Sequence, residues 1–354
     1  MHRRSVLRRA AFSLALVFLF CLCAMLPSCG LMRQRSFSRT VDGPFDTAAL
    51  IRIYADKEDD ANAFLDLFES ELREWDKLAD IYYEYEGLNN LRTLNLAAGV
   101  APVALDPRLL DLLEYGLSAK EATGGRVDLL LGSVLSLWHE CRTAGQNDPE
   151  HARVPTEAEL SEAAKIASAA TLVIDRAAGT AFLPIAGSSV DVGAVAKGYA
   201  TEAICRKLES LGFTDFAANV GGNLRVSGSA AGTSWQFSVR DPNGSKTIGQ
   251  IERTGKTAIA TSGSYQRYYT VDGVRYHHVI DPDTNYPAAF GWVSVSVLCD
   301  DAGVADVLST ALFCLDYDAG VSLISGGSSP VSALWINESG ETFAVGAFAE
   351  GGGK

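Results

Sequence analysis

Residues 188–204 read SSVDVGAVAKGYATEAI and separate two parts of the chain that differ in texture. Before this stretch, apolar residues recur mainly at helical spacing. After it, short alternating segments are broken by turn residues, as in antiparallel strands. Helices first and antiparallel strands later indicate an α+β fold rather than a parallel, doubly wound sheet. The sequence therefore predicts N-terminal helices packed on antiparallel sheet.

The same stretch predicts a short β-like segment that ends near Asp191, followed by a helix with its first apolar position at Val195. A glycine-rich turn that opens a helix points N–H groups at whatever lies beyond it, often a phosphate. The carboxylate of Asp191 would repel a phosphate unless a cation lay between them. Two interpretations stay open: an ordinary turn before a helix, or half of a site that holds phosphate and metal.

The other expected elements follow from periodicity and turn signals. Asp106 is expected as an N-cap with Pro107 at the first helical position, and Thr156 with Glu159 as a capping box. Residues 139–155 are expected to form a polar loop. Helices are predicted at residues 58–82, 106–123, 124–140, 156–168 and 301–317, and strands at 47–55, 223–228, 234–244, 249–255, 256–263, 266–273, 274–282 and 292–299.

Composition narrows the class of protein. The chain has 354 residues, 47% hydrophobic and 21% charged, which fits a folded globular protein. The formal net charge of −13 argues against nucleic acid as a partner, and an anionic ligand would need a metal ion or a local lysine. Beyond the leader, the cysteines are too widely spaced for a zinc site or a disulfide scaffold, and buried thiols are expected. They are Cys141, Cys205, Cys299 and Cys314.

The N-terminus resembles the signal of an exported bacterial lipoprotein. A basic start precedes an apolar run, and LPSCG then places Cys29 as the residue to be lipidated. An uncleaved anchor helix is the alternative. The expected organisation is a signal peptide at 1–28, a polar tether at 29–44 and a single domain at 45–349, anchored to the outer face of the cytoplasmic membrane or periplasmic.

Two later segments carry candidate chemistry. Asp306 and Thr310 stand four residues apart in a predicted helix, so both lie on one face and can ligate a hard cation such as Mg²⁺. In the alternative, Thr310 bonds back to its own helix and Asp306 faces solvent. Residues 261–263 predict a tight polar turn in which Thr261 and Ser262 help to hold a phosphate, or a plain β-turn.

The segment RYHHVIDPDTNYPA contains two adjacent histidines, His277 and His278. In an alternating strand they point to opposite faces, so at most one lines a given site. Histidine is a natural general base near neutral pH, but a partly buried structural histidine fits these residues equally well.

Taken together and in order, these motifs resemble the FAD:protein FMN transferases, the ApbE-like flavin transferases. VDVGAVAKGYATEAI is similar to the central signature of that family, and NVGGNLRVSG, VRDP, ATSGSYQRYY, YHHVIDPDTNYPA and AGVADVLSTALFCL are similar to its later ones. The resemblance covers about residues 45–345 and implies an ApbE-like, T-fold-related architecture. It also implies Mg²⁺-dependent transfer of FMN from FAD to a threonine hydroxyl of an acceptor protein, with release of AMP.

The resemblance also implies residue roles. His278 would take the proton from the attacking hydroxyl, and the Ala194 carbonyl, Asp306 and Thr310 would hold Mg²⁺. The implied partners are FAD and FMN-binding domains of exported electron-transfer proteins. The residues expected to contact FAD are Phe45, Tyr83, Asp128, Asp191, Lys197, Thr261, Ser262 and Val279.

The chain departs from the family pattern in two of these places, and at a third the choice of residue is open. Phe45 lies in Phe-Asp-Thr where the family usually has Met-Gly-Thr, and Asp128 is kept in a segment whose threonine is replaced by Leu130. Tyr83 is chosen from three tyrosines that include Tyr82 and Tyr85. Two other activities stay open: an FAD-binding lipoprotein without transfer activity, and an FAD hydrolase that gives FMN and AMP.

Overall fold

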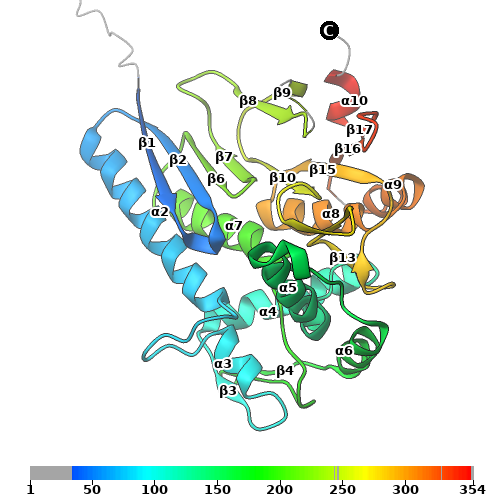
Figure 1. The fold of residues 1–354 in the computed structure, drawn as a ribbon. Helices are drawn as coiled ribbons and strands as arrows, with labels where there is room; N and C mark the ends of the chain where they lie inside the picture. The colour runs from blue at the N-terminus through cyan, green and yellow to red at the C-terminus, as the bar shows by residue number, and fades with distance from the viewer. Residues whose placement is uncertain (1–33, 243, 245–246, 328, 352–354) are drawn as a thin grey trace, which may run out of the picture.

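The computed structural model describes residues 34–242, 244, 247–327 and 329–351. Within them, the main feature is an eight-stranded sheet whose neighbouring strands are all antiparallel (Figure 1). In sheet order its strands are β1 (Arg35–Asp42), β2 (Ala48–Ala55), β6 (Phe216–Val220), β7 (Asn223–Ser227), β10 (Thr257–Gly263), β15 (Trp292–Cys299), β16 (Ser332–Asn337) and β17 (Thr342–Val345).

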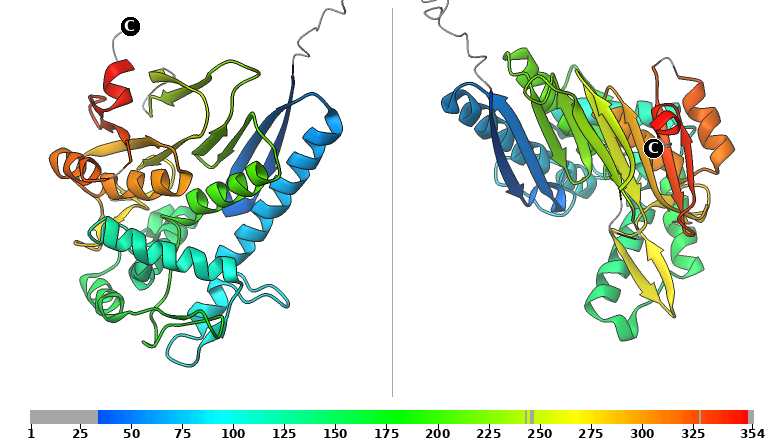
Figure 2. Two further views of the ribbon diagram at one scale, coloured as in Figure 1. Left: turned by 180° about the vertical axis from the view of Figure 1, so that it is seen from behind. Right: turned by 90° about the horizontal axis from the view of Figure 1, so that it is seen from above.

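Helices cover one face of this sheet, and a hairpin with a short helix covers the other (Figure 2). The α+β class predicted from the sequence is confirmed. The helices are α2 (Glu58–Ala79), α3 (Leu91–Leu96), α4 (Pro107–Ala122), α5 (Gly132–Asn147), α6 (Glu157–Ala169), α7 (Ala196–Ser210), α8 (Ala302–Phe313), α9 (Tyr317–Ser325) and α10 (Ala347–Gly351), with 3-10 turns η1 (Pro44–Asp46), η2 (Leu129–Leu131) and η3 (Pro149–His151).

Smaller sheets complete the architecture. Hairpin β8–β9 packs with α10 over the second face of the main sheet, and hairpin β11–β12 packs against α5. The short strands are β3 (Val103–Ala104), β4 (Val173–Asp175), β5 (Thr180–Phe182), β8 (Trp235–Arg240), β9 (Thr247–Arg253), β11 (Tyr268–Val271), β12 (Val274–His277), β13 (Ile280–Asp281) and β14 (Tyr286–Pro287).

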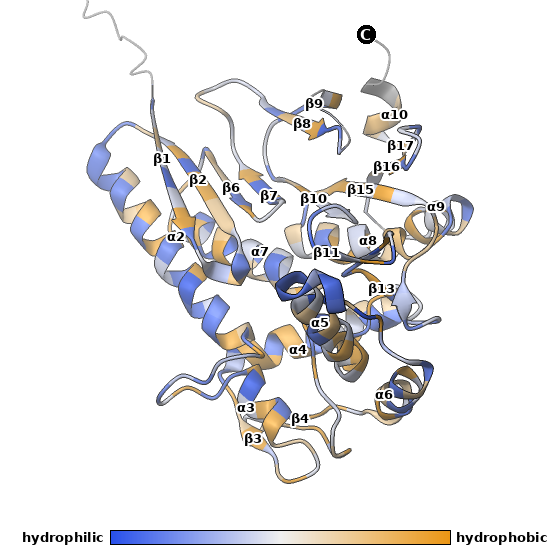
Figure 3. Ribbon diagram, viewed as in Figure 1, coloured by the Kyte–Doolittle hydropathy of each residue, from blue (hydrophilic) through white to orange (hydrophobic). Residues whose placement is uncertain are grey.

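Helix α2 illustrates how the sequence forms the main layer. Phe64, Phe68 and Leu72 recur every four residues and are buried under the sheet. Its opposite face is charged, which Figure 3 shows as blue on the outer side and orange on the inner side. Three acidic residues in the first turn face the positive end of the helix dipole, which favours a helix beginning at Glu58.

The helix caps predicted for α4 and α6 are confirmed. The Asp106 side chain accepts from Arg108 N–H at 2.8 Å, with Pro107 at the first position of α4. Thr156 and Glu159 form a reciprocal capping box at the start of α6. These caps pair backbone N–H groups that the first helical turn leaves without partners.

Two expectations about local structure were wrong. Most of the predicted tether is strand β1, which pairs with β2 from Arg35↔Ala55 to Asp42↔Ala48. Arg39 ties this strand to α2 through Asp66 and Glu69, so the fold begins before residue 45. The predicted loop at 139–155 is largely helical, since α5 runs to Asn147.

The predicted signal peptide and Cys29 lie outside the described residues. Within the described ranges, no helix is both long and apolar enough to span a membrane. The four cysteines Cys141, Cys205, Cys299 and Cys314 are buried and unpaired, as expected.

Candidate active site

The centre of the candidate site is the crossing of α7 and α8. The helix predicted after Asp191 begins at Ala196, with Val195 as its N-cap. Gly198, in its first turn, donates its N–H to Asp306 Oδ2 on α8 at 2.8 Å. A Cβ on Gly198 would lie 2.4 Å from the Ala302 carbonyl oxygen, so only glycine lets the two helices approach this closely.

The second predicted ligand, Thr310, lies on the same face of α8 one turn beyond Asp306. Its hydroxyl is 3.2 Å from Ser262 Oγ on β10, and Ser262 Oγ is also 2.9 Å from Ser309 Oγ. Ser309 in turn donates to the Asp306 carbonyl at 3.0 Å. Buried Asp306 therefore shares its helix face with a cluster of hydroxyls.

Thr261 and Ser262 do not form the tight turn that the sequence suggested. Both belong to β10, which continues to Gly263 and pairs there with Ser294 of β15. Because side chains alternate along a strand, Ser262 faces α8 whereas the Thr261 hydroxyl bonds to Ser296 Oγ at 2.8 Å. Only Ser262 of this pair reaches the Asp306 cluster.

The donors around α8 fit a hard divalent cation. The Asp306 carboxylate and the Thr310 hydroxyl offer oxygen ligands, as Mg²⁺ prefers. The Ala194 carbonyl lies before the first helical hydrogen bond of α7, which Val195 accepts as N-cap. No group of three or more His, Cys, Asp or Glu side chains in the described ranges forms a metal cluster. A metal at Asp306 would therefore take further oxygens from phosphate and water.

Asp191 lies in an extended segment just before α7, not in a strand. Its Oδ1 accepts from Gly193 N–H at 2.7 Å, and its own N–H donates to the Leu129 carbonyl at 2.9 Å. The side chain keeps some solvent contact but is surrounded by protein, and this desolvation raises its pKa. The Gly193 N–H and the nearby His139, Lys197 and Arg142 lower the pKa in opposition.

The two adjacent histidines have different environments. His277 ends β12, where its Nδ1 accepts from Val279 N–H at 3.3 Å and its Nε2 donates to the Ala288 carbonyl at 3.1 Å. Its ring packs edge-on against Phe313, with centroids 5.5 Å apart. Both nitrogens of His277 are thus committed to structure.

His278 has a free ring nitrogen. Its backbone N–H donates to the Arg267 carbonyl at 3.1 Å, while its Nδ1 is buried with no partner among the described residues. Burial, followed by the charges of Arg267, Lys197 and Arg142, lowers its pKa to about 3. The imidazole is therefore neutral near pH 7 and able to accept a proton.

Of the three tyrosines considered, Tyr82 lies nearest this site. Its hydroxyl is 3.1 Å from His139 Nδ1, and the two rings lie tilted by 31° with centroids 4.9 Å apart. Burial, then the charge of Asp191, raises the pKa of Tyr82 to about 12. Tyr82 itself is 47% exposed, so this burial is partial, whereas Tyr83 is 70% exposed. The Tyr85 hydroxyl is turned away to donate to Asp80 Oδ2 at 2.7 Å.

Three other predicted contacts are placed as follows. Phe45 has a left-handed backbone with φ 56°, and its N–H donates to Asp76 Oδ1 at 2.6 Å. Asp128 caps η2 through Leu130 N–H at 2.9 Å and pairs with Lys120 Nζ at 2.8 Å, which gives this carboxylate a structural role. The Val279 side chain is buried in the apolar cluster around α8.

The sequence analysis missed three residues of this region. Arg142 Nη2 on α5 lies 2.9 Å from His139 Nδ1, and Arg267 donates to the carbonyls of Phe45 and Asp46 at 3.3 and 3.4 Å. Because arginine only donates, His139 Nδ1 must be an acceptor. The spacing of His139, Arg142 and Gln146 at i, i+3 and i+7 would have indicated one helical face.

The comparisons with known proteins identify the family of the chain. A model of the ApbE family matches residues 45–335. The chain is 32% identical over 249 residues to an FAD:protein FMN transferase of Treponema pallidum, covering 66% of this chain and 67% of that relative. It is 28% identical over 258 residues to an FAD:protein FMN transferase of Vibrio cholerae, covering 72% and 75%.

Solved structures show the same architecture. The crystal structure of the ApbE protein of Thermotoga maritima matches with a TM-score of 0.76 at 26% identity, covering 90% of this chain and 100% of that one. The flavin transferase ApbE from Vibrio cholerae matches with a TM-score of 0.72 at 24% identity, covering 90% and 99%.

Proposed function

Because the chain belongs to the ApbE family and is an FAD:protein FMN transferase, we propose that it moves FMN from FAD to a threonine hydroxyl of an acceptor protein and releases AMP. The observation that carries the proposal is the 2.8 Å contact between Gly198 N–H and Asp306 Oδ2. It joins the segment before α7 to the oxygen donors on α8. His278, whose Nδ1 has no partner among the described residues, is the proposed base of this site.

In this reaction the threonine oxygen attacks the phosphorus that carries the flavin. The bond from this phosphorus to the AMP phosphate oxygen breaks, and the electron pair leaves with AMP. His278 takes the hydroxyl proton, for which its low pKa leaves a lone pair available near neutral pH. The chain contributes mainly positioning and charge stabilisation, as is usual for transfer of a phosphoryl group.

Mg²⁺ would be held by the Ala194 carbonyl, Asp306 and Thr310. When bound, it would neutralise the pyrophosphate and the leaving AMP phosphate. Lys197 would add a second positive charge at the start of α7, where its Nζ lies 3.4 Å from the Gly193 carbonyl. Phosphate can then lie near Asp191 because cations stand beside it.

The flavin ring is assigned to the Tyr82 side of the site. Tyr82 is chosen over Tyr83 because it is held by His139 and lies close to Asp191, whereas Tyr83 faces solvent. Ser262 acts through Thr310, and Phe45 shapes the loop that Arg267 contacts.

The acceptors are proposed to be FMN-binding domains of exported electron-transfer proteins. This follows from the lipoprotein-like leader, with Cys29 as the anchored residue on the outer face of the cytoplasmic membrane or in the periplasm. Labelling cells with a radioactive fatty acid tests the anchor. Label on the wild type but not on Cys29→Ala supports it, and equal label on both contradicts it.

The test of transfer is the intact mass of an FMN-binding domain after incubation with the leaderless protein, FAD and Mg²⁺. An FMN-sized gain on one threonine, absent with EDTA and absent when that threonine is alanine, is expected. Free FMN and AMP without any gain would instead show that water is the acceptor.

A further inference from the structure

Two arginines next to His278 have only neutral polar partners in the described part of the chain. Arg142 bonds to His139 Nδ1, and Arg267 bonds to two backbone carbonyls. Several other arginines of this acidic chain pair with carboxylates: Arg176 with Glu114, for example, and buried Arg225 with Glu202. A guanidinium left with neutral partners keeps donors for an anion.

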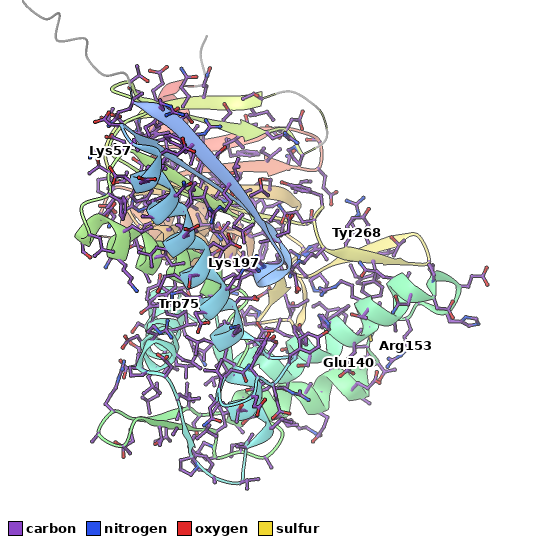
Figure 4. The ribbon with its side chains drawn as sticks, turned by 90° about the vertical axis from the view of Figure 1, so that its left-hand side faces the viewer. Lys57, Trp75, Glu140, Arg153, Lys197 and Tyr268 are labelled. Atoms are coloured by element: carbon purple, nitrogen blue, oxygen red, sulfur yellow. The ribbon has the colours of Figure 1, made fainter. Side chains whose placement is uncertain are left out.

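Packing of α5 on hairpin β11–β12 brings the two arginines to one place. Gln146 Nε2 on α5 donates to the Tyr268 carbonyl at 2.9 Å, and a Cβ on Gly145 would lie 2.9 Å from the Tyr269 ring. Arg142 is one helical turn before Gln146, and Arg267 directly precedes Tyr268. Figure 4 shows Tyr268 on the hairpin and Glu140 on α5 along the same flank of the molecule.

His278 belongs to the same group, since its backbone N–H bonds to the Arg267 carbonyl at 3.1 Å. Burial and then the charge of Arg267 lower the pKa of Arg142, whereas Tyr82, Asp191 and Asp46 raise it by smaller amounts. The charges of Arg267, Lys197 and Arg142 all lower the pKa of His278, so all three cations act on this ring. Like charges in one region repel one another, and an anion bound between them relieves the repulsion.

We propose that Arg142 and Arg267 clamp the phosphate of FAD that carries the flavin, which is the phosphate that is transferred. The inference rests on the proposed function. Arg267 is bonded to the residue that accepts the threonine proton, and Arg142 shares His139 with Tyr82 on the flavin side. Both arginines therefore lie beside the phosphorus that the threonine oxygen attacks, and not beside the AMP phosphate.

The clamp stabilises charge during transfer. As the bond from the threonine oxygen to phosphorus forms and the bond to the AMP oxygen breaks, the outer oxygens of the transferred phosphate stay between two guanidiniums. The electron pair leaves with AMP and the proton goes to His278, so atoms and charge balance.

The test is flavin-fluorescence titration without metal, using FMN and riboflavin as probes. They carry the same ring and differ only in the phosphate. We expect Arg142→Gln and Arg267→Gln each to weaken FMN binding by about tenfold or more while riboflavin binding stays unchanged. Arg142→Lys, which keeps the charge, is expected to lose less.

Arg275→Gln is the matched control. Arg275 is exposed on the same hairpin, stacked 4.2 Å above the Tyr268 ring, and its loss is expected to change neither titration. Unchanged FMN affinity in both glutamine variants would overturn the clamp, as would an equal loss of riboflavin and FMN binding. Circular dichroism of each variant checks folding, and Arg142→Lys serves if Arg142→Gln does not fold.

The outcome can be separated from that of the proposed function. Wild-type protein that transfers no flavin in the mass assay contradicts the function itself. Wild-type protein that transfers flavin, with glutamine variants that still distinguish FMN from riboflavin, contradicts the clamp alone.

Discussion

Gly198 and Asp306 are 108 residues apart in the chain, yet the glycine N–H donates to the aspartate Oδ2 at 2.8 Å. The contact requires α7 and α8 to approach so closely that a Cβ on Gly198 would also lie 2.4 Å from Asp306 Cβ. Gly198 thus holds Asp306, the predicted metal ligand, against the first turn of α7.

Gly198→Ala is therefore expected to push the two helices apart. The obstacle is the Ala302 carbonyl, which is backbone and cannot swing aside, so we expect a loss of about 1–3 kcal/mol in the free energy of unfolding. Transfer activity is expected to fall by much more than this loss of stability would explain by itself. Urea unfolding and the mass assay measure the two effects.

Gly326→Ala is the control for that variant. Gly326 has helical backbone angles, and its added Cβ would meet nothing closer than 3.8 Å. If both alanine variants behave alike, the α7–α8 contact has no special role.

Asp306→Ala is expected to abolish metal-dependent transfer with the fold intact. The carboxylate is the charged member of the predicted ligand set, and its loss leaves only neutral oxygens for Mg²⁺. Isothermal titration with Mg²⁺ and FAD, together with the mass assay, measures the effect. Asp300 is exposed, and Asp300→Ala, the control, is expected to leave transfer activity unchanged. Full activity of Asp306→Ala at ordinary Mg²⁺ would refute the metal assignment.

Alanine variants of the two histidines are expected to have different effects, one on the rate of transfer and the other on stability. His278→Ala should slow transfer by about a hundredfold or more while FAD binding changes little, since a positioned base typically contributes this much. His277→Ala should mainly lower the melting temperature, because it removes the Ala288 bond and the Phe313 contact. A larger loss of rate in His277→Ala would show that the base was assigned to the wrong residue.

The sequence predicted the fold class and the common helix face of Asp306 and Thr310 because these depend on local periodicity. Helical spacing placed Asp306 and Thr310 on one face, and caps such as Asp106 have local signals. Residues that are far apart in the sequence and meet only in the folded site have no such local signal. Arg142 and Arg267 come to one region only because α5 packs on β11. Strand β1 was missed because Phe37 and Val41 are its only apolar residues, between exposed serine and threonine.

The tyrosine segment shows the same limit. Tyr82 and Tyr83 are adjacent and lie outside helices and strands. Periodicity therefore cannot indicate which of the two faces the site. The structure separates them through His139, which holds the Tyr82 hydroxyl. Tyr82→Ala is expected to weaken flavin binding by about tenfold through loss of an aromatic contact, whereas Tyr83→Ala should have no effect. Riboflavin titration measures both variants, and the reverse order would return the flavin contact to Tyr83.

The pH dependence of stability provides a test that does not need the substrate. The pKa of His278 is about 3 in the folded protein and about 6.5 when unfolded, so below pH 6.5 the unfolded chain binds a proton that the folded chain does not. The free energy of unfolding is unaffected by protonation of His278 above about pH 6.5. Below that pH it decreases as the pH falls, by up to about 1.4 kcal/mol per pH unit. Asp191 acts in the opposite direction, because its raised pKa favours the folded state as the pH falls.

Comparison with His278→Gln isolates the histidine, since Asp191 is present in both proteins. From about pH 7.5 to about pH 5.5, wild-type stability is expected to fall more steeply than that of the variant. Urea unfolding at each pH gives both slopes. Parallel slopes would show that His278 is protonated as readily in the folded protein as in the unfolded chain. In that case it would not be the neutral base that the mechanism requires.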